Sequence, residues 1–167
     1  LALPADKRDP ARIARIEIAT FHEGKRLHVT HPATTEQAQY SLPWSVACAL
    51  GRGTVDVAGV CDELEALDLR ALASKVEIHE DEAFNARFPA ERWARAKLHL
   101  DSGEVIESAD FEARGNPDKP LSDAEVIDKY QALAEPVLGE RATRLREVVM
   151  SLEARNASEL LGLLSAP

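Results

Sequence analysis

The sequence is poor in cysteine, in aromatic residues and in long apolar runs. Its 167 residues include two cysteines, and 5% of the residues are aromatic. Because this is too little cysteine for the disulfide framework of a small secreted domain, we interpret Cys48 and Cys61 as buried, reduced thiols of a cytoplasmic protein. No apolar stretch approaches the length that spans a bilayer, so we expect no membrane partner.

Basic residues are also scarce relative to acidic ones. Lys and Arg number 20 against 29 Asp and Glu, which gives a net charge of −9. A nucleic-acid-binding surface must neutralise phosphates, so we expect no nucleic-acid partner. Hydrophobic residues make up 45% of the chain, which argues against a disordered tail. Residues 1–10 contain no initiator methionine and resemble a linker, so we expect the chain to be a fragment of a longer protein.

The first half of the sequence predicts short strands mixed with helices. Period-two alternation predicts strands over residues 12–21 and 27–30, joined as a hairpin by the turn Glu23–Arg26. Ser41 is expected to cap the following helix, with Pro43 in its first turn and nearly every later position apolar or small. Four other segments are expected: a loop over 32–39, a helix over 57–74, a strand over 75–79 and an acidic loop over 80–82.

The second half predicts one clear hairpin and then helices. Residues 94–100 alternate between apolar and basic side chains, reach a turn at Asp101–Gly103, and are followed by a returning strand over 105–111. After a proline-bounded loop, Ser122 and Glu125 form a capping box, and apolar stripes continue at helical spacing. We therefore predict an α+β fold: a small antiparallel sheet with packed helices in a two-layer sandwich, followed by a C-terminal helical segment.

No pattern of metal ligands or catalytic nucleophiles stands out. His28, His31, His79 and His99 are expected on strands or their edges, without a second ligand at metal-binding spacing. The sequence has no Gly-x-Ser-x-Gly motif, and Cys48 is expected in an apolar helix where its thiol stays protonated. We therefore predict no metal site in this chain.

The start of the Ser41 helix is the strongest candidate for a binding site. A helix N-terminus carries free N–H groups and a partial positive charge, which suit a carboxylate or a phosphate. The substrate-binding candidates are therefore Gln39, Tyr40, Ser41 and Trp44. The alternative is that Ser41 only caps the helix and that Tyr40 and Trp44 only pack.

Three segments, in the same order, resemble one protein family. The segment Pro32–Leu50 contains Tyr-Ser-Leu-Pro-Trp-Ser-Val-Ala and resembles the Phe-Ser-Leu-Pro-Tyr-x-Val-Ala segment of the MmgE/PrpD family. Leu98–Gly103 resembles the family's hairpin, and Gly115–Tyr130 resembles its Gly-x-x-x-x-Pro-Leu-Ser…Lys-Phe stretch. The family includes 2-methylcitrate dehydratase, cis-aconitate decarboxylase and iminodisuccinate epimerase.

The resemblance implies that this chain is the smaller part of an enzyme. Members combine a large helical domain with an α/β lid, so residues 1–120 correspond to the lid and residues 121–167 to helices that pack on the absent N-terminal helical domain. Members remove, add or invert a substituent beside a carboxylate of a small di- or tricarboxylic acid, without a metal or organic cofactor. Their acid and base residues lie in the helical domain, so no catalytic residue is expected in this chain and the isolated chain should be inactive.

The resemblance also bears on the candidate site. Trp44 stands where several members have a tyrosine near the active cleft, Tyr40 replaces the usual phenylalanine, and Gln39 stands where a lysine is common. A tryptophan has no phenolic hydroxyl for proton transfer. The substrate and the choice among dehydration, decarboxylation and epimerisation therefore stay open.

We expect a cytoplasmic enzyme of the 2-methylcitrate dehydratase type, with a place in propionate metabolism. Its expected partners are a small carboxylic-acid substrate, the missing helical domain and a second copy in a homodimer. One alternative is the lid of an epimerase or decarboxylase of the same family. The other, from a different class, is a stand-alone binding or oligomerisation module without catalysis.

Overall fold

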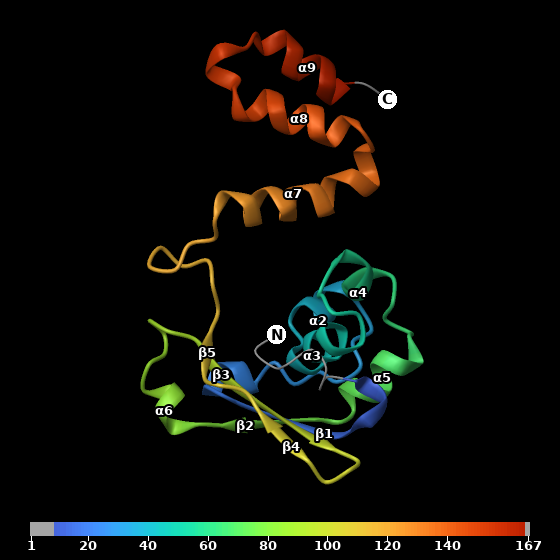
Figure 1. Ribbon diagram of the computed structural model, residues 1–167, viewed down its shortest axis with the longest axis vertical. Coiled ribbons are helices and arrows are strands. Elements are labelled where there is room, and N and C mark those ends of the chain that lie inside the picture. The colour runs from blue at the N-terminus through green and yellow to red at the C-terminus, as the bar shows by residue number, and fades with distance from the viewer. Residues whose placement is uncertain (1–8, 166–167) are drawn as a thin grey trace. The chain divides into compact units, whose positions relative to one another are not determined.

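The computed structural model describes residues 9–165, which form two compact units (Figure 1). The units divide between Ala113 and Arg114. The first unit contains a sheet and the helices that cover it, and the described residues of the second unit form helices and loops. The predicted α+β class and the helical C-terminal segment are therefore confirmed. The division into a lid over residues 1–120 and helices for another domain stays a prediction.

Within the described part of the first unit, five strands form one sheet. Their order is β2-β1-β3-β4, and the short β5 pairs with β3. The strands are β1 Ile13–Thr20, β2 Val76–Glu80, β3 Trp93–Leu100, β4 Val105–Glu107 and β5 Phe111–Glu112. β1 runs antiparallel to β3 but parallel to β2. The sheet is therefore mixed, and not antiparallel throughout as the sequence predicted, because the chain reaches β2 through a helical crossover instead of a hairpin.

The hairpin expected between residues 12–21 and 27–30 is wrong. β1 is present, but α1, His22–Lys25, follows it, and residues 27–30 form no strand. Both edges of β1 are occupied by β2 and β3, so no edge remains for a third partner. Instead, the carbonyls of Leu27 and Val29 accept hydrogen bonds from Leu42 N and Ser41 Oγ at the start of α3.

The helices of the first unit are short, and some differ from expectation. They are α2 Thr35–Gln39, α3 Leu42–Gly51, α4 Val57–Cys61, α5 Leu67–Ala73 and α6 Glu82–Asn85, with a 3₁₀ turn η2 at Pro10–Arg12. Part of the expected 32–39 loop is helical, with Thr34 as its cap. The expected acidic loop is also wrong, because Glu80 ends β2 and Asp81 caps α6.

The single helix expected over residues 57–74 is broken into α4 and α5. An unbroken helix of that length would extend about 27 Å. The break at Asp62–Ala66 instead lets Val60 and Leu64 pack against the same core as Leu69 and Leu72 of α5. The free energy gained by burying these side chains exceeds that of continuing the helix through residues 62–66. Each fully buried aliphatic side chain contributes about 1.5–3 kcal/mol.

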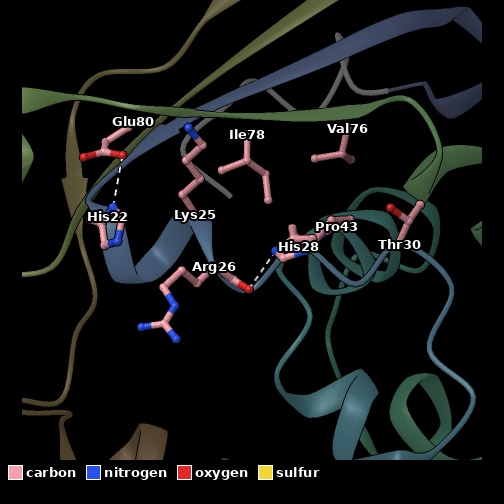
Figure 2. A pocket seen from close by; sticks show the side chains of 9 residues that line it. All are labelled: His22, Lys25, Arg26, His28, Thr30, Pro43, Val76, Ile78 and Glu80. Atoms are coloured by element: carbon pink, nitrogen blue, oxygen red, sulfur yellow. Dashed lines mark hydrogen bonds and ion pairs between the residues drawn. The ribbon is translucent and has the colours of Figure 1, made fainter.

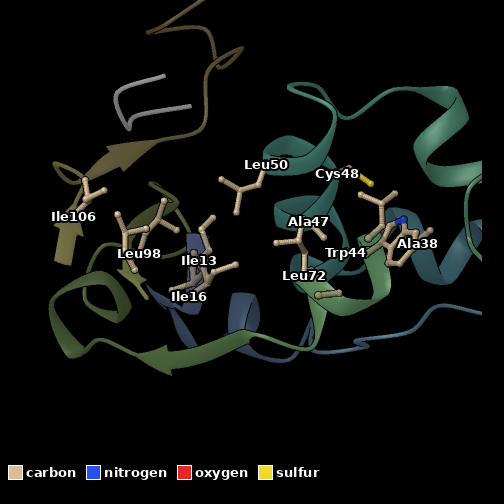
Figure 3. Close-up of a cluster of buried hydrophobic side chains, with 14 residues drawn as sticks. Ile13, Ile16, Ala38, Trp44, Ala47, Cys48, Leu50, Leu72, Leu98 and Ile106 are labelled. Atoms are coloured by element: carbon tan, nitrogen blue, oxygen red, sulfur yellow. The ribbon is translucent and has the colours of Figure 1, made fainter. Parts of the chain in front are cut away.

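The helices and the sheet form two layers around one core. Figure 1 shows α2, α3 and α4 gathered over one face of the sheet. Figure 3 shows Ile13, Ile16 and Leu98 of the strands facing the side chains of α3 and α5. The core from these helices includes Trp44, Ala47, Cys48, Leu50, Leu69 and Leu72. The other sheet face carries charged residues such as Glu17 and Lys97, so the sheet buries one face only.

The predicted hairpin of β3 and β4 is confirmed, but the returning strand expected over 105–111 is interrupted, because β4 ends at Glu107 and β5 begins at Phe111. Leu98 pairs with Ile106, and Gly103 adopts a φ of 85° in the connecting turn. That backbone conformation favours glycine, which explains the Asp-Ser-Gly sequence of the turn.

The second unit consists of α7 Asp123–Leu138, α8 Arg141–Met150, the 3₁₀ turn η3 Leu152–Ala154 and α9 Ala157–Ser165. The predicted capping box at Ser122 and Glu125 is confirmed, and Gly139, with a φ of 55°, ends α7. Tyr130 donates a hydrogen bond from its hydroxyl to Ala142 O at 2.9 Å, which fastens α7 to α8. Among the described helices, none combines the length and the apolar character needed to cross a lipid bilayer.

Candidate functional site

Ser41 is the N-cap of α3, as the sequence predicts, and its hydroxyl is fully engaged. It accepts a hydrogen bond from Trp44 N at 3.0 Å and donates one to Val29 O. Ser41 is 2% exposed. The side chain therefore joins the start of α3 to the preceding segment.

The other N–H groups in the first turn of α3 also have partners inside the protein. Leu42 N donates to Leu27 O at 2.8 Å, and Ser45 N donates to Ser41 O at 3.1 Å. Pro43 has no N–H group. A carboxylate could therefore use the N–H groups of this turn only by displacing one of these hydrogen bonds.

Trp44 lies inside the first unit. It is completely buried, and its indole Nε1 donates to Gly59 O, in α4, at 2.8 Å. The ring fills the space between α3 and α4, and its polar atom is satisfied there, which suits a structural role. Contact between Trp44 and a ligand stays a prediction that requires an opening of this packing.

Gln39 and Tyr40 have surface positions. Gln39 ends α2, and Tyr40 is 70% exposed immediately before the cap of α3. The four predicted residues therefore lie in one short segment, but they differ in their exposure to solvent. Gln39 and Tyr40 can reach a ligand from solvent, whereas Ser41 and Trp44 are buried.

A cleft of about 360 Å³ lies next to the start of α3 (Figure 2). Pro43 of α3, together with Val76 and Ile78 of β2, supplies apolar lining. The other lining residues are polar: His22, Lys25, Arg26, His28, Thr30 and Glu80. We call the whole pocket the basic cleft. It therefore combines apolar surface with a cluster of cationic and imidazole groups.

Glu80 is the one carboxylate among the described lining residues of the basic cleft. It accepts hydrogen bonds from Asn85 Nδ2 at 2.7 Å and His22 Nδ1 at 3.2 Å. The hydrogen bond from Asn85, which has the larger effect, and the one from His22 hold the pKa of the Glu80 carboxyl below its usual value. Glu80 is therefore ionised at neutral pH and already partnered at one end of the cleft.

No sequence pattern predicted the basic cleft. Lys25 and Arg26 were expected in a simple turn and His28 on a strand, but α1 and the irregular segment after it carry these residues. His31 is also off any strand, and its Nε2 lies 2.9 Å from Ser74 Oγ. The adjacent Lys25 and Arg26 in an acidic chain were a possible signal, but the sequence could not show that β2 lies opposite them.

An apolar groove of about 400 Å³ occupies the second unit. Its lining comes from all three helices and includes Val126, Ile127, Tyr130, Leu145, Val149 and Leu160. Val126 and Val149 are each about half exposed. The predicted apolar stripes therefore converge on one groove.

The two cysteines differ in environment. Cys48 is buried, and burial raises the pKa of its thiol, which keeps it protonated and unreactive. Cys61 is exposed at the end of α4, so its expected burial is wrong; the break after α4 leaves it at the surface. Within residues 9–165, no three His, Cys, Asp or Glu side chains are grouped so as to hold a metal ion.

Comparison with known proteins identifies the family. The MmgE/PrpD C-terminal domain matches residues 1–154, which is most of the chain. No curated protein gives a significant match. The family match covers all three segments that resemble MmgE/PrpD sequences, and it includes the sheet, α3, α7 and α8. The chain therefore belongs to the MmgE/PrpD family, of which it carries the C-terminal domain.

Proposed function

We propose that this chain is the lid part of an MmgE/PrpD-type enzyme that acts on small di- or tricarboxylic acids, with 2-methylcitrate dehydration as the first candidate reaction. The family match over residues 1–154 is the observation that carries this proposal. In this proposal the chain closes the active cleft and binds substrate carboxylates, and a separate helical domain supplies the acid and base. No metal or organic cofactor is required.

The apolar groove supports the need for a second domain. Val126 and Leu164, which line the groove, are more than half exposed, although each is an aliphatic side chain on a regular helix. Contiguous apolar surface of this kind marks an interaction site. We propose that an N-terminal helical domain covers the groove and that two such chains form a homodimer.

We further propose a reducing, cytoplasmic setting, consistent with a role in propionate metabolism. Both cysteines are free thiols in the structure. An exposed thiol such as Cys61 persists in a reducing compartment but is prone to oxidation outside it.

The test compares this chain with a longer protein that includes the helical domain encoded upstream of it. Both proteins are assayed with 2-methylcitrate, cis-aconitate and iminodisuccinate, by product chromatography. We expect turnover of one substrate by the longer protein and none by this chain. Turnover by the chain alone, or a longer protein inactive on all three, would overturn the proposal.

A matched pair of variants tests the role of the groove. Val126→Asp places a charge inside the groove, whereas Val137→Asp makes the same change on the same helix at an 80% exposed position outside the groove. A buried unpaired charge is strongly unfavourable at an interface. We expect Val126→Asp to weaken association with the helical domain by more than tenfold and Val137→Asp to leave it unchanged.

The second candidate is a stand-alone oligomerisation module, and the exposed groove favours it as well. In this case the chain would associate with itself at micromolar concentrations without any other domain. Light scattering of the chain, repeated with the Val126→Asp and Val137→Asp variants, distinguishes the candidates. Self-association that only Val126→Asp removes, together with no response to the helical domain, would favour the module.

A further inference from the structure

β2 is an edge strand of the sheet. In the order β2-β1-β3-β4 it has one neighbour, β1, which runs parallel to it (Figure 1). Lys75 O accepts a hydrogen bond from β1 just before β2 begins, and Asp81 N donates one to β1 just after β2 ends. Because the backbone groups of a strand alternate between its two sides, the intervening odd-numbered residues also bond to β1. The residues whose N–H and C=O groups point away from β1 are therefore Val76, Ile78 and Glu80.

These outward backbone groups are free in the part of the chain that the structure describes. Within residues 9–165, no group forms a hydrogen bond with the backbone N–H or C=O of Val76, Ile78 or Glu80. Such an edge pairs with another strand unless a proline, a lysine or a bulge prevents it. Residues 76–80 contain neither proline nor lysine, and their register with β1 is continuous. The edge is therefore open to a further strand.

The sequence of β2 is complementary to itself when two copies run antiparallel. With a two-fold axis at Ile78, this residue lies opposite Ile78 of the second copy. Glu77 then lies opposite His79, and Val76 lies opposite Glu80. The outward-pointing residues are placed symmetrically about the axis, so each facing pair of them can exchange both N–H···O hydrogen bonds. All the outward groups of the strand are then satisfied.

The side chains on the open face of the sheet favour this register over its neighbours. Glu77 and His79 are 49% and 57% exposed there. As a pair without backbone hydrogen bonds, they have Cα atoms about 4.5 Å apart, so the imidazole can donate to the carboxylate. An axis at Glu77 or at His79 would instead place two identical side chains directly opposite each other, and like charges in that position are destabilising.

The other face of β2 gives the pairing an apolar contact. Val76 packs against the core of the first unit, and Ile78 lies beside Pro43 in the basic cleft (Figure 2). A second copy would bring its own Val76 and Ile78 against them and remove apolar surface from water. Glu80 lies on the same face, but its carboxylate keeps its hydrogen bonds from His22 and Asn85, so pairing leaves it no unpaired charge.

We propose that β2 is a homodimer interface, in which two copies pair their β2 strands antiparallel about a two-fold axis at Ile78 and form one continuous sheet. This inference rests on the proposed function for the existence of a homodimer, and it assigns a surface to that dimer. The contact uses the same edge of both copies, so association through it stops at two chains. Because the paired segment is short, the dissociation constant of this chain falls in the micromolar range.

The test is amide hydrogen exchange of the 167-residue chain, measured by ¹H–¹⁵N spectra at low and high protein concentration. The amides of Val76, Ile78 and Glu80 should exchange about tenfold more slowly where most of the chain is dimeric. The amides of Glu77 and His79 already donate to β1, so their exchange should not change with concentration. Sedimentation of the same samples gives the mass. A chain that stays monomeric, or a dimer without this alternating protection, would overturn the proposal.

Charged variants at the axis provide the second test. Ile78→Lys and Ile78→Glu each place a charge opposite its own copy, so each alone should weaken self-association by more than about tenfold. An equimolar mixture of the two variants should recover a heterodimer, because opposite charges then meet at the axis. Val105→Lys makes the same change at a 52% exposed position on β4, the other edge strand, and should leave self-association unchanged.

Failure of the folded variants to recover pairing in the mixture would contradict an axis at Ile78. Circular dichroism shows whether each variant folds. The exchange experiment uses the unaltered chain, so it decides the question even where a variant does not fold.

The outcomes also separate this interface from the apolar groove and from the proposed reaction. Self-association that Val126→Asp removes and Ile78→Lys keeps would overturn the β2 interface. A longer protein that is active and dimeric, and whose mass is unaffected by Ile78→Lys, would overturn the β2 interface alone. A β2 dimer together with a longer protein that turns over none of the three substrates would overturn the proposed reaction and leave the interface.

Discussion

Replacement of Ser41 by alanine tests whether the start of α3 is primarily a structural junction. The hydroxyl of Ser41 accepts from Trp44 N and donates to Val29 O, and the side chain is almost completely buried. Alanine removes both hydrogen bonds without adding volume. The first turn of α3 then loses its cap, and the 27–30 segment loses one of its two attachments to α3.

The expected loss of stability follows from the two bonds. Loss of a serine N-cap costs about 1 kcal/mol, with a range of 0.5–2. Loss of a second, largely buried hydrogen bond costs about another 1 kcal/mol. Ser41→Ala should therefore lower the free energy of unfolding of the first unit by about 2 kcal/mol. With a urea m-value of about 2 kcal/mol/M, the midpoint should fall by about 1 M.

Urea unfolding followed by tryptophan fluorescence measures this effect in the first unit. Both tryptophans of the chain, Trp44 and Trp93, belong to that unit. Ser45→Ala is the matched control, because Ser45 Oγ bonds to Ser41 O at 2.8 Å within the same helix. There the lost bond is offset by the better helix propensity of alanine, so the change should stay within about 0.5 kcal/mol.

A midpoint for Ser41→Ala that equals that of Ser45→Ala would refute the reasoning. It would mean that the bonds of Ser41 contribute nothing net to the folded state. A ligand-binding role for Ser41 would then gain weight, because its burial and its two partners would no longer explain the residue.

Two further predictions concern the second unit. Arg114, and then the backbone and hydroxyl of Ser122, hold the pKa of Glu125 at about 2 instead of the usual 4.5. Since the folded state favours the ionised form, this stabilisation is present above pH 4.5 and is lost as the pH falls toward 2. The helicity measured by circular dichroism should decline over that pH window. Glu125→Gln should remove this part of the decline. Gly139→Ala should destabilise the α7–α8 junction by about 1 kcal/mol because its φ is 55°, whereas Gly162→Ala, inside α9 and with open space around it, should raise helix stability by up to about 1 kcal/mol. Thermal unfolding by circular dichroism measures both, and an equal response of the two glycines would contradict the prediction.

Local sequence signals predicted much of the fold. The cap at Ser41, the capping box at Ser122, the turn at Gly103 and the ends of β1 depend on residues only a few positions apart. Such interactions form within one turn or one hairpin, so they can be read from neighbouring residues. The family resemblance is also carried by short segments of this kind, and the comparison over residues 1–154 confirms it.

The candidate site was only partly predictable. The sequence placed Gln39, Tyr40, Ser41 and Trp44 in one segment, but it could not show which of them face solvent. Trp44 is enclosed because α4 comes back over α3 and offers Gly59 O, a contact across 15 positions of sequence. Exposure depends on such distant packing and not on the residue type alone.

By itself, the sequence determined the α+β class, the family, the cap of α3 and the helical C-terminal segment, because composition, alternation and caps act over short distances. The tertiary structure alone decided that β1 pairs with β2 and β3, leaving residues 27–30 to bind the start of α3. It also decided that Cys61 lies at the surface and that Lys25 and Arg26 line a cleft against β2. Each of these outcomes depends on which of several distant segments occupies a given strand edge or buried surface. Local sequence patterns cannot predict this, because they involve only neighbouring residues.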